Sequence, residues 1–159
     1  MNNLYYENIL THKISLSSNM LSKNLDYYIL DILKEKIGNK CINEGYVDKD
    51  SIEIIKRSIG KLDSNNINGN IDFIVNFKSK ICNPLLNNII DCVVDDNNKI
   101  GIIALNKPLD IVLSKRHHQN KEPFKILKKN DRILVKVIDK TFNLYDDSII
   151  VLGEFVKKI

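Results

Sequence analysis

The sequence predicts an α+β protein in which an antiparallel sheet, covered by one helix, precedes a five-stranded β-barrel. One segment near residues 22–38 repeats its apolar residues at helical spacing, whereas other apolar segments of the first half alternate as strands do. Beyond Pro84 no helical period recurs, and five short apolar segments are separated by turn residues. The 159 residues, 43% of them hydrophobic, suffice for one globular domain or two small ones.

The predicted helix lies in the segment SKNLDYYILDILKEKIG. Its apolar stripe consists of Leu25, Tyr28, Ile29, Ile32, Leu33 and Ile37. Ser22 or Asn24 can cap its start, Asp26 suits the first turn, and a left-handed Gly38 is expected to end it. The stripe requires a sheet to cover.

Strands of that sheet are predicted on both sides of the helix. Residues 9–16 precede it, and the segment KCINEGYV, with Gly45 at a turn or bulge, follows it. The segment IDFIVNFKSKI alternates strictly, which predicts a strand with one apolar face. Between them, DSIEIIKRSIG fits both a strand and a helix, and Asn68-Gly69 is the strongest signal for a tight turn.

The second half contains five predicted strands. Pro84 marks the boundary before them, because proline interrupts strand pairing. The strand segments are LLNNIIDCVV, KIGIIAL, LDIVLS, DRILVKVIDK and SIIVLGEF. Ile100, Ile102, Ile111 and Leu113 of these segments are expected to lie mostly in the core. Five strands with a glycine in the second are typical of an OB-fold, a small barrel that often binds oligonucleotides. The longest connection, KRHHQNKEPFKILKKN, separates the third and fourth strands.

Composition narrows the function classes. A net charge of +4 and a pI near 8.8 permit contact with nucleic acid but do not require it. Cys41, Cys82 and Cys92 lack zinc-ligand spacing and are an odd number, which favours a reducing compartment. Because neither a signal peptide nor an apolar run of about 20 residues is present, we expect a soluble intracellular protein without membrane contact.

No constellation typical of catalysis or cofactor binding is found. The DDNN of residues 95–98 begins like a calcium loop, but Lys99 and Ile100 occupy positions that need a ligand and a glycine. His117 and His118 are adjacent, so their side chains would diverge on a strand. A phosphate-binding glycine loop is also missing. The sequence therefore predicts a protein that is not an enzyme, with no cofactor and no metal site.

Several motifs, in order along nearly the whole chain, resemble one known family. An aromatic-led strand, Tyr5-Tyr6, and an I-x-L step at Ile14 and Leu16 precede the helix. The later motifs are GYV after Cys41, VNFKSKICNP, IIDCVV and NKIGIIALNKPLDIVLSKRH. This pattern is similar to the larger stalk subunit of multisubunit DNA-directed RNA polymerases, the family formed by the subunit-seven proteins of RNA polymerase II and their archaeal counterparts.

The chain departs from the family pattern at a few positions. Ser18 stands where a proline is common, Lys107 where a glycine usually precedes Pro108, and Asn87 where a glycine often opens the first barrel strand. Ile103 occupies a position that is often aromatic. Because stacking on an aromatic contributes about 1–3 kcal/mol per base, we expect RNA contact through this face to be weaker and more ionic. The Asn-rich, compact form suggests a divergent, viral polymerase.

The resemblance implies two domains and a noncatalytic role. Residues 1–81 would form a truncated RNP-like tip domain that docks on the polymerase core near the clamp. Residues 82–159 would form an OB-fold that contacts nascent single-stranded RNA. The implied partners are core polymerase subunits and a smaller helical stalk subunit, giving a heterodimer. The implied location is the nucleus or, for a viral protein, the virion and host cytoplasm.

Two groups of candidate site residues follow. The docking candidates lie in short loops with apolar anchors and few long charged side chains. They are Gly45, Tyr46, Gly60, Leu62, Asn66, Ile67 and Gly69. The RNA candidates are cations along one groove, which would bind phosphates without reading bases. They are Lys99, Lys115, Arg116 and His117, with Lys78, Lys80 and Lys136 as second-line candidates.

Two other function classes stay open at this point. The chain could be a free-standing OB-fold protein that binds single-stranded RNA, which an exposed aromatic pair on the second and third barrel strands would favour. It could also be an enzyme of RNA metabolism, against which the missing carboxylate cluster argues.

Overall fold

The computed structural model describes residues 4–21, 24–62 and 69–159. Contacts divide the chain into two units that are discontinuous in sequence. The sheet unit comprises Tyr5–Asn39 and Val47–Ile81, and the barrel unit comprises Met1–Leu4, Lys40–Tyr46 and Cys82–Ile159. The α+β class and a closed five-stranded barrel are confirmed. The division into domains at 1–81 and 82–159 stays a prediction.

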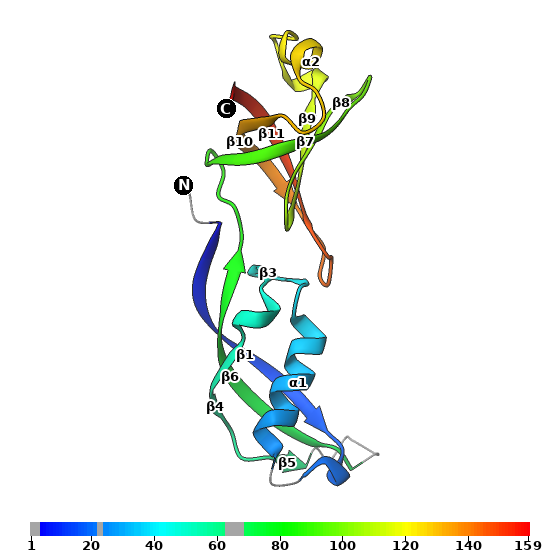
Figure 1. The fold of residues 1–159 in the computed structure, drawn as a ribbon. Helices are drawn as coiled ribbons and strands as arrows, with labels where there is room; N and C mark the ends of the chain where they lie inside the picture. Colours follow the sequence, from blue (N-terminus) through cyan, green and yellow to red (C-terminus); the bar gives the residue numbers. More distant parts are fainter. Residues whose placement is uncertain (1–3, 22–23, 63–68) are drawn as a thin grey trace. The chain divides into compact units, whose positions relative to one another are not determined.

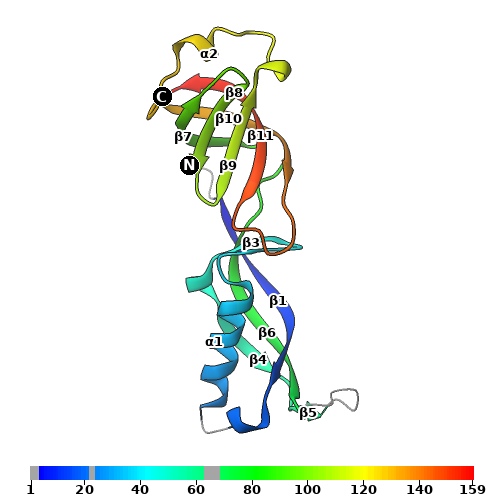
Figure 2. The same cartoon turned by 90° about the vertical axis from the view of Figure 1, so that its right-hand side faces the viewer.

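The sheet unit is organised around one long strand, β6 (Ile71–Cys82). On one side β6 pairs with β1 (Tyr5–Leu16). On the other side it pairs with β4 (Glu53–Arg57) and then with β5 (Lys61–Leu62) (Figures 1 and 2). The segment whose pattern fitted both helix and strand is thus a strand, β4.

The apolar core of the sheet unit lies between β6 and helix α1 (Leu25–Ile37), which forms within the predicted segment. Tyr28 of the predicted apolar stripe is, however, 37% exposed. The alternation along β6 buries Phe73, Val75 and Phe77. The helix contributes its own buried stripe, Ile29, Leu33 and Ile37. Arg57 on β4 joins the layers, because its Nε donates to Asp26 of α1 at 2.5 Å and its guanidinium lies 5.7 Å from the Phe73 ring centroid.

The helix ends differently from the sequence prediction. Gly38 has φ −63° and ψ 135°, an extended conformation, so the left-handed Gly38 cap is wrong. The next residue, Asn39, has φ 54° instead, and asparagine tolerates this region better than most residues. Gly38 is required for space, since a Cβ there would lie 2.3 Å from the main-chain oxygen of Lys34.

The face of β6 opposite the core has polar side-chain pairs with β1. Thr11 Oγ1 donates to Asn76 Oδ1 at 2.8 Å, Ser15 donates to Asp72, and Lys13 Nζ lies 3.1 Å from Asp72. The Ser15 hydrogen bond, together with Lys13, holds the pKa of Asp72 below its ordinary value of 3.8. These pairs fix the register of β1 against β6.

Replacing Ser15 with Ala is expected to raise the pKa of Asp72, because the carboxylate loses its strongest hydrogen bond. In the native protein Asp72 stabilises the fold above its unfolded pKa, and that contribution is lost as the pH falls through the lower folded pKa. An NMR titration of the Asp72 carboxyl carbon in both proteins measures the shift. Equal pKa values in the two proteins would contradict the role assigned to Ser15.

The barrel unit contains the five strands predicted for the second half. They are β7 (Ile89–Asn97), β8 (Gly101–Asn106), β9 (Leu109–Ser114), β10 (Arg132–Thr141) and β11 (Ile149–Lys158). Their order around the closed barrel is β7-β8-β9-β11-β10. The β9–β11 pair is parallel, and the other neighbouring pairs are antiparallel.

Alternate residues of these strands fill the barrel interior. Ile102, Ile111 and Leu113 are buried, as predicted. Ile100, also predicted to be core, is 77% exposed, so that prediction is wrong. The reason is a turn before β8, in which Asn98 Oδ1 accepts hydrogen bonds from the amides of Ile100 (3.0 Å) and Gly101 (3.2 Å).

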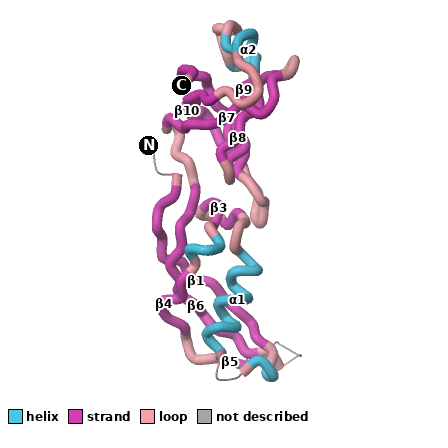
Figure 3. The backbone as a smooth tube through the Cα atoms, in the orientation of Figure 1, coloured by secondary structure: helices cyan, strands magenta, loops and turns pink. Residues whose placement is uncertain are grey.

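Short elements complete both units (Figure 3). The described part of the sheet unit includes two 3₁₀ turns, Ser18–Met20 and Lys49–Ser51. In the barrel unit, η3 (Lys115–His117) and α2 (Pro123–Ile126) lie between β9 and β10. None of the helices in the described segments is long and apolar enough to cross a membrane.

A small hairpin made by β2 (Cys41–Ile42) and β3 (Gly45–Val47) is joined to the barrel by main-chain hydrogen bonds. The Cys41 amide donates to the Asp146 oxygen at 2.8 Å, and the Tyr145 amide donates to the Cys41 oxygen at 2.7 Å. Asn83 Nδ2 donates to the Glu44 oxygen at 2.9 Å. These bonds explain why Lys40–Tyr46 belongs to the barrel unit.

Candidate functional site

Four of the predicted RNA-binding residues come together at one end of the barrel. Gly101 at the start of β8 pairs with Ser114 at the end of β9, and the Lys115 amide donates to the Ile100 oxygen at 3.2 Å. This pairing brings the turn that contains Lys99 beside η3, which carries Lys115, Arg116 and His117. The first-line RNA candidates therefore share one surface.

His118 holds this end of the barrel in place. Its Nε2 accepts a hydrogen bond from the Phe155 amide of β11 at 3.0 Å, and its Nδ1 lies 2.7 Å from the Ser114 oxygen. Because Nε2 accepts, Nδ1 carries the proton that is donated to Ser114. Both ring nitrogens are thus occupied by main-chain partners, which gives His118 a structural role.

Lys115 packs partly against the aromatic ring of Phe124. Its Nζ lies 5.8 Å from the ring centroid of Phe124, which is 6% exposed and packs edge-on against His118. Asn97 Nδ2 donates to the oxygens of Phe124 (2.8 Å) and Leu127 (2.9 Å), which ties the α2 segment to β7. Arg116 and His117 are exposed and available to a ligand.

The positive surface extends beyond the predicted residues. Four further exposed lysines, Lys121, Lys125, Lys128 and Lys129, follow η3, and Glu122 is the single acidic residue in 115–130. Together with the first-line candidates they form what we call the basic cap, consisting of Lys99, Lys115, Arg116, His117, Lys121, Lys125, Lys128 and Lys129. The long loop KRHHQNKEPFKILKKN already contained this signal as six Lys or Arg against one Glu.

The second-line RNA candidates lie on other elements than the basic cap. Lys78 Nζ lies 3.7 Å from Glu53, and both Lys78 and Lys80 line a cavity of about 480 Å³ in the sheet unit. The cavity is also lined by four acidic residues, Glu7, Asp48, Asp50 and Glu53. Lys136 on β10 pairs with Glu154 of β11 on one side and with Ile89, the first residue of β7, on the other. The turn that contains Lys99 follows the opposite end of β7.

The predicted docking residues are distributed over both units. Gly45, with φ 134°, and Tyr46 belong to the barrel unit, whereas Gly60, Leu62 and Gly69 belong to the sheet unit. Two further candidates, Asn66 and Ile67, lie outside the described residues. A Cβ on Gly60 would lie 2.6 Å from Ile71 and 2.9 Å from Phe73, so Gly60 serves packing. Gly69 has φ 68° and open space around it.

Exposed aliphatic side chains mark one end of the sheet unit. Ile59, which precedes β5, is 85% exposed, and Leu62, the last residue of β5, is 70% exposed. Met20 and Leu21, each 41% exposed, belong to the 3₁₀ turn Ser18–Met20 and its C-cap. This turn follows β1 and lies at the same end of the sheet unit as β5 (Figures 1 and 2). We call these four residues the apolar tip. Clustered exposed apolar side chains of this kind are typical of protein contact surfaces.

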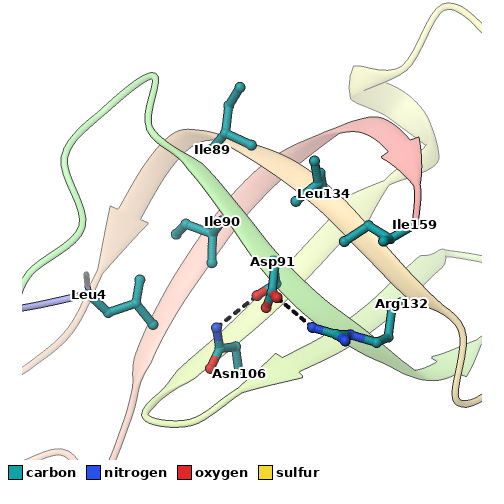
Figure 4. Close-up of a pocket in the computed structure, with 8 residues that line it drawn as sticks. All are labelled: Leu4, Ile89, Ile90, Asp91, Asn106, Arg132, Leu134 and Ile159. Atoms are coloured by element: carbon teal, nitrogen blue, oxygen red, sulfur yellow. Dashed lines mark hydrogen bonds and ion pairs between the residues drawn. The ribbon is translucent and has the colours of Figure 1, made fainter. Parts of the chain in front are cut away.

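A shallow cavity of about 560 Å³ lies on the barrel (Figure 4). Its apolar lining consists of Leu4, Ile89, Ile90, Leu134 and Ile159. Arg132 donates to the Asp91 carboxylate at 2.7 Å, and Asn106 donates to the Asp91 main-chain oxygen at 2.7 Å. Because Asp91 pairs with Arg132, the cavity offers mainly apolar contacts.

The cysteines are protonated core residues at neutral pH. Burial raises the pKa of Cys41 to about 11 and that of Cys82 and Cys92 to about 12. A thiol with such a pKa is a poor nucleophile, because the thiolate is the reactive form. Among the described residues, no group of three or more His, Cys, Asp or Glu side chains is placed to hold a metal ion.

Comparison with known proteins finds a viral relative but no matching family. A scan against protein families finds no match for this chain. In a search of curated proteins, the chain is 27% identical over 166 residues to a protein of Acanthamoeba polyphaga mimivirus named "Putative DNA-directed RNA polymerase subunit". The alignment covers 96% of this chain and 82% of the mimivirus protein. The similarity therefore extends over both units.

Proposed function

We propose that this chain is a noncatalytic, stalk-type subunit of a DNA-directed RNA polymerase. The observation that carries the proposal is the similarity, along 96% of the chain, to a mimivirus protein named as a polymerase subunit. The motif order that resembles the stalk family supports the finer assignment. The barrel order β7-β8-β9-β11-β10, with α2 before the fourth strand, supports an OB-fold, and the helix-covered sheet supports an RNP-like tip domain.

In this proposal the two units have different tasks. The apolar tip docks on the polymerase core, and the basic cap contacts nascent RNA through phosphates. Cations on an exposed loop bind single strands without reading sequence, and their affinity falls steeply with salt. A smaller helical subunit completes the heterodimer that the stalk resemblance implies.

Affinity purification of the tagged full-length chain from cells that contain its polymerase tests the docking assignment. The largest polymerase subunits are expected to co-elute with the native chain. The double variant Ile59→Glu, Leu62→Glu is expected to reduce this co-elution at least tenfold. The reason is that a buried interface disfavours unpaired charge.

Ile9→Glu is the control for the introduction of a carboxylate elsewhere on the sheet unit. Ile9 is also exposed, at 65%, but lies on β1 outside the apolar tip, so its variant is expected to co-elute normally. A free-standing RNA-binding protein would bind RNA without co-eluting polymerase, and that result would overturn the subunit assignment. Normal co-elution of the Ile59→Glu, Leu62→Glu variant would contradict only the assignment of the apolar tip as the docking surface.

Removing charge from the basic cap is expected to weaken RNA binding and its salt dependence together. Replacing Arg116, Lys121 and Lys125 with Ala removes three exposed cations and spares Lys115, which packs on Phe124. If each contacts one phosphate, the slope of log affinity against log salt becomes shallower by about 2. Fluorescence anisotropy with a labelled oligouridylate at several salt concentrations measures this slope.

A triple variant of the sheet unit controls for net charge in the RNA experiment. Replacing Lys34, Lys36 and Lys56 with Ala changes the total charge equally but leaves the basic cap intact. This variant is expected to keep the native slope. Equal slopes for all three proteins would show that the phosphate contacts lie elsewhere.

A further inference from the structure

The outward face of three neighbouring barrel strands has an unusual composition. On β9, Leu109, Ile111 and Leu113 are buried, so the residues between them point away from the barrel interior. The same alternation on β8 and β11 directs four aliphatic side chains outward. The outward residues, which we call the β9 face, are Ile103, Leu105, Asp110, Val112, Ile150 and Leu152.

Strand register arranges these six residues in two rows. Val112 is opposite Ile103 on β8 and opposite Leu152 on β11. Asp110 is opposite Leu105 on β8 and opposite Ile150 on β11. Ile150 is 49% exposed, and the other five are half-buried. The β9 face is therefore a continuous aliphatic surface with one carboxylate at the centre of one row.

The Asp110 carboxylate has no hydrogen-bond or ion-pair partner among the described residues. Its cross-strand neighbours are aliphatic, and they supply no donor. A ligand that covered this face would remove water from the carboxylate, at a high cost unless the ligand supplied a cation. The face therefore selects for a ligand that combines apolar surface with one positive charge.

RNA does not have this chemistry. The β9 face has no aromatic side chain for base stacking and no Lys or Arg for phosphates, and Asp110 repels a phosphate chain. A second copy of this chain is also a poor ligand, because twofold symmetry would bring two Asp110 carboxylates to the same interface. A different protein fits better.

We propose that the β9 face binds a partner protein through an amphipathic helix whose apolar side carries one Lys or Arg opposite Asp110. Strand addition is unsuitable, because β9 is already paired on both edges in the closed barrel. Three strands spaced about 4.8 Å apart span about 10 Å, which matches the diameter of a single helix. This inference goes beyond the polymerase proposal and does not depend on it.

Two synthetic peptides test the proposal with the full-length protein. Both form amphipathic helices with a Leu stripe, and they differ in one residue at the centre of that stripe, Lys in one and Glu in the other. In ¹⁵N NMR spectra the Lys peptide is expected to shift amide signals of β8, β9 and β11. It is also expected to bind about tenfold more tightly than the Glu peptide.

Substitutions that change the charge at position 110 distinguish a specific ion pair with the peptide from nonspecific apolar binding. Asp110→Lys is expected to reverse the preference, so that the Glu peptide binds more tightly, and Asp110→Asn is expected to abolish it. Asp31→Lys makes the same charge change on the exposed side of α1 and is expected to leave the native preference unchanged. The NMR spectrum of each variant also reports whether the barrel is folded.

Other outcomes would overturn the proposal. Equal affinity of both peptides for the native protein, or an unchanged preference after Asp110→Asn, would show that Asp110 does not determine which peptide binds. Shifts of the β8 and β9 amides by oligouridylate, with none from either peptide, would assign the face to RNA. Failure of the polymerase proposal would appear in co-purification and would leave these peptide measurements unchanged.

Discussion

Replacing Gly101 with Ala is expected to destabilise the barrel by about 3 kcal/mol. A Cβ at this position would lie 2.1 Å from the Leu113 main-chain oxygen and 3.0 Å from the Leu113 carbonyl carbon. A flexible side chain could move away, but this neighbour is the backbone of the adjacent strand. The β8–β9 pairing must therefore open at the end that supports η3 and the basic cap.

Urea denaturation followed by circular dichroism measures the loss in free energy of unfolding, and hydrogen exchange locates it. Amides of β8 and β9 should lose protection first, and RNA affinity should fall because the basic cap is displaced. Gly69→Ala is the control, because nothing lies within 4 Å of its added Cβ and only the positive φ, about 1–2 kcal/mol, opposes the change. Native stability of the Gly101 variant would contradict the close approach.

Replacing Phe77 with Ala is expected to cost about 3–5 kcal/mol, through lost apolar burial and the cavity left behind. Phe77 on β6 is 1% exposed and pairs with Ile54 of β4, under the layer that contains α1. The damage should be concentrated in the sheet unit. Hydrogen exchange should increase first in Tyr5–Asn39 and Val47–Ile81.

A neighbouring residue on the same strand provides the control for Phe77. Ile74 points to the opposite face and is 55% exposed, so Ile74→Ala is expected to cost well under 1 kcal/mol in the same denaturation experiment. Similar losses for the two variants would show that the core does not lie on the Phe77 face. Co-elution with polymerase should fall for the Phe77 variant, since the apolar tip belongs to the damaged unit.

Local patterns predicted the secondary structure well where periodicity was long and unbroken. The helix bounds Leu25–Ile37 follow from a stripe of six apolar residues with turn residues after it. The five barrel strands follow from alternation, because a barrel with a filled interior requires every second side chain to be apolar. Such signals depend on neighbours in sequence, which a single chain displays directly.

The wrong predictions concern positions where one specific contact, and not the periodicity of the segment, decides the conformation. Gly38 looked like a left-handed cap, but its small size serves contact with Lys34 and Lys49, and Asn39 takes the positive φ. Ile100 looked like part of a strand, but the Asn98 side chain holds it in a turn. In each case the residue type was informative, but the hydrophobic pattern did not show the contact that decides the conformation.

The candidate site was predictable in part. Lys99 and η3 were expected in one groove, and strand register does place them side by side. The later lysines of the basic cap were overlooked, because a Lys-rich loop is usually solvent-exposed without function. The β9 face could not be found without register, since Asp110 and Leu105 become neighbours only when β8 and β9 pair.

The main-chain hydrogen bonds between Cys41 and residues 145–146 limit how the gene for this protein can recombine. The backbone changes units at 4/5, 39/40, 46/47 and 81/82, so neither unit is encoded by one uninterrupted stretch of its gene. Recombination that exchanged codons 82–159 alone would pair a new barrel with an old hairpin. The coding sequences of the two units are therefore expected to be inherited together. Homologous proteins in which only one of the two units has been exchanged should be rare.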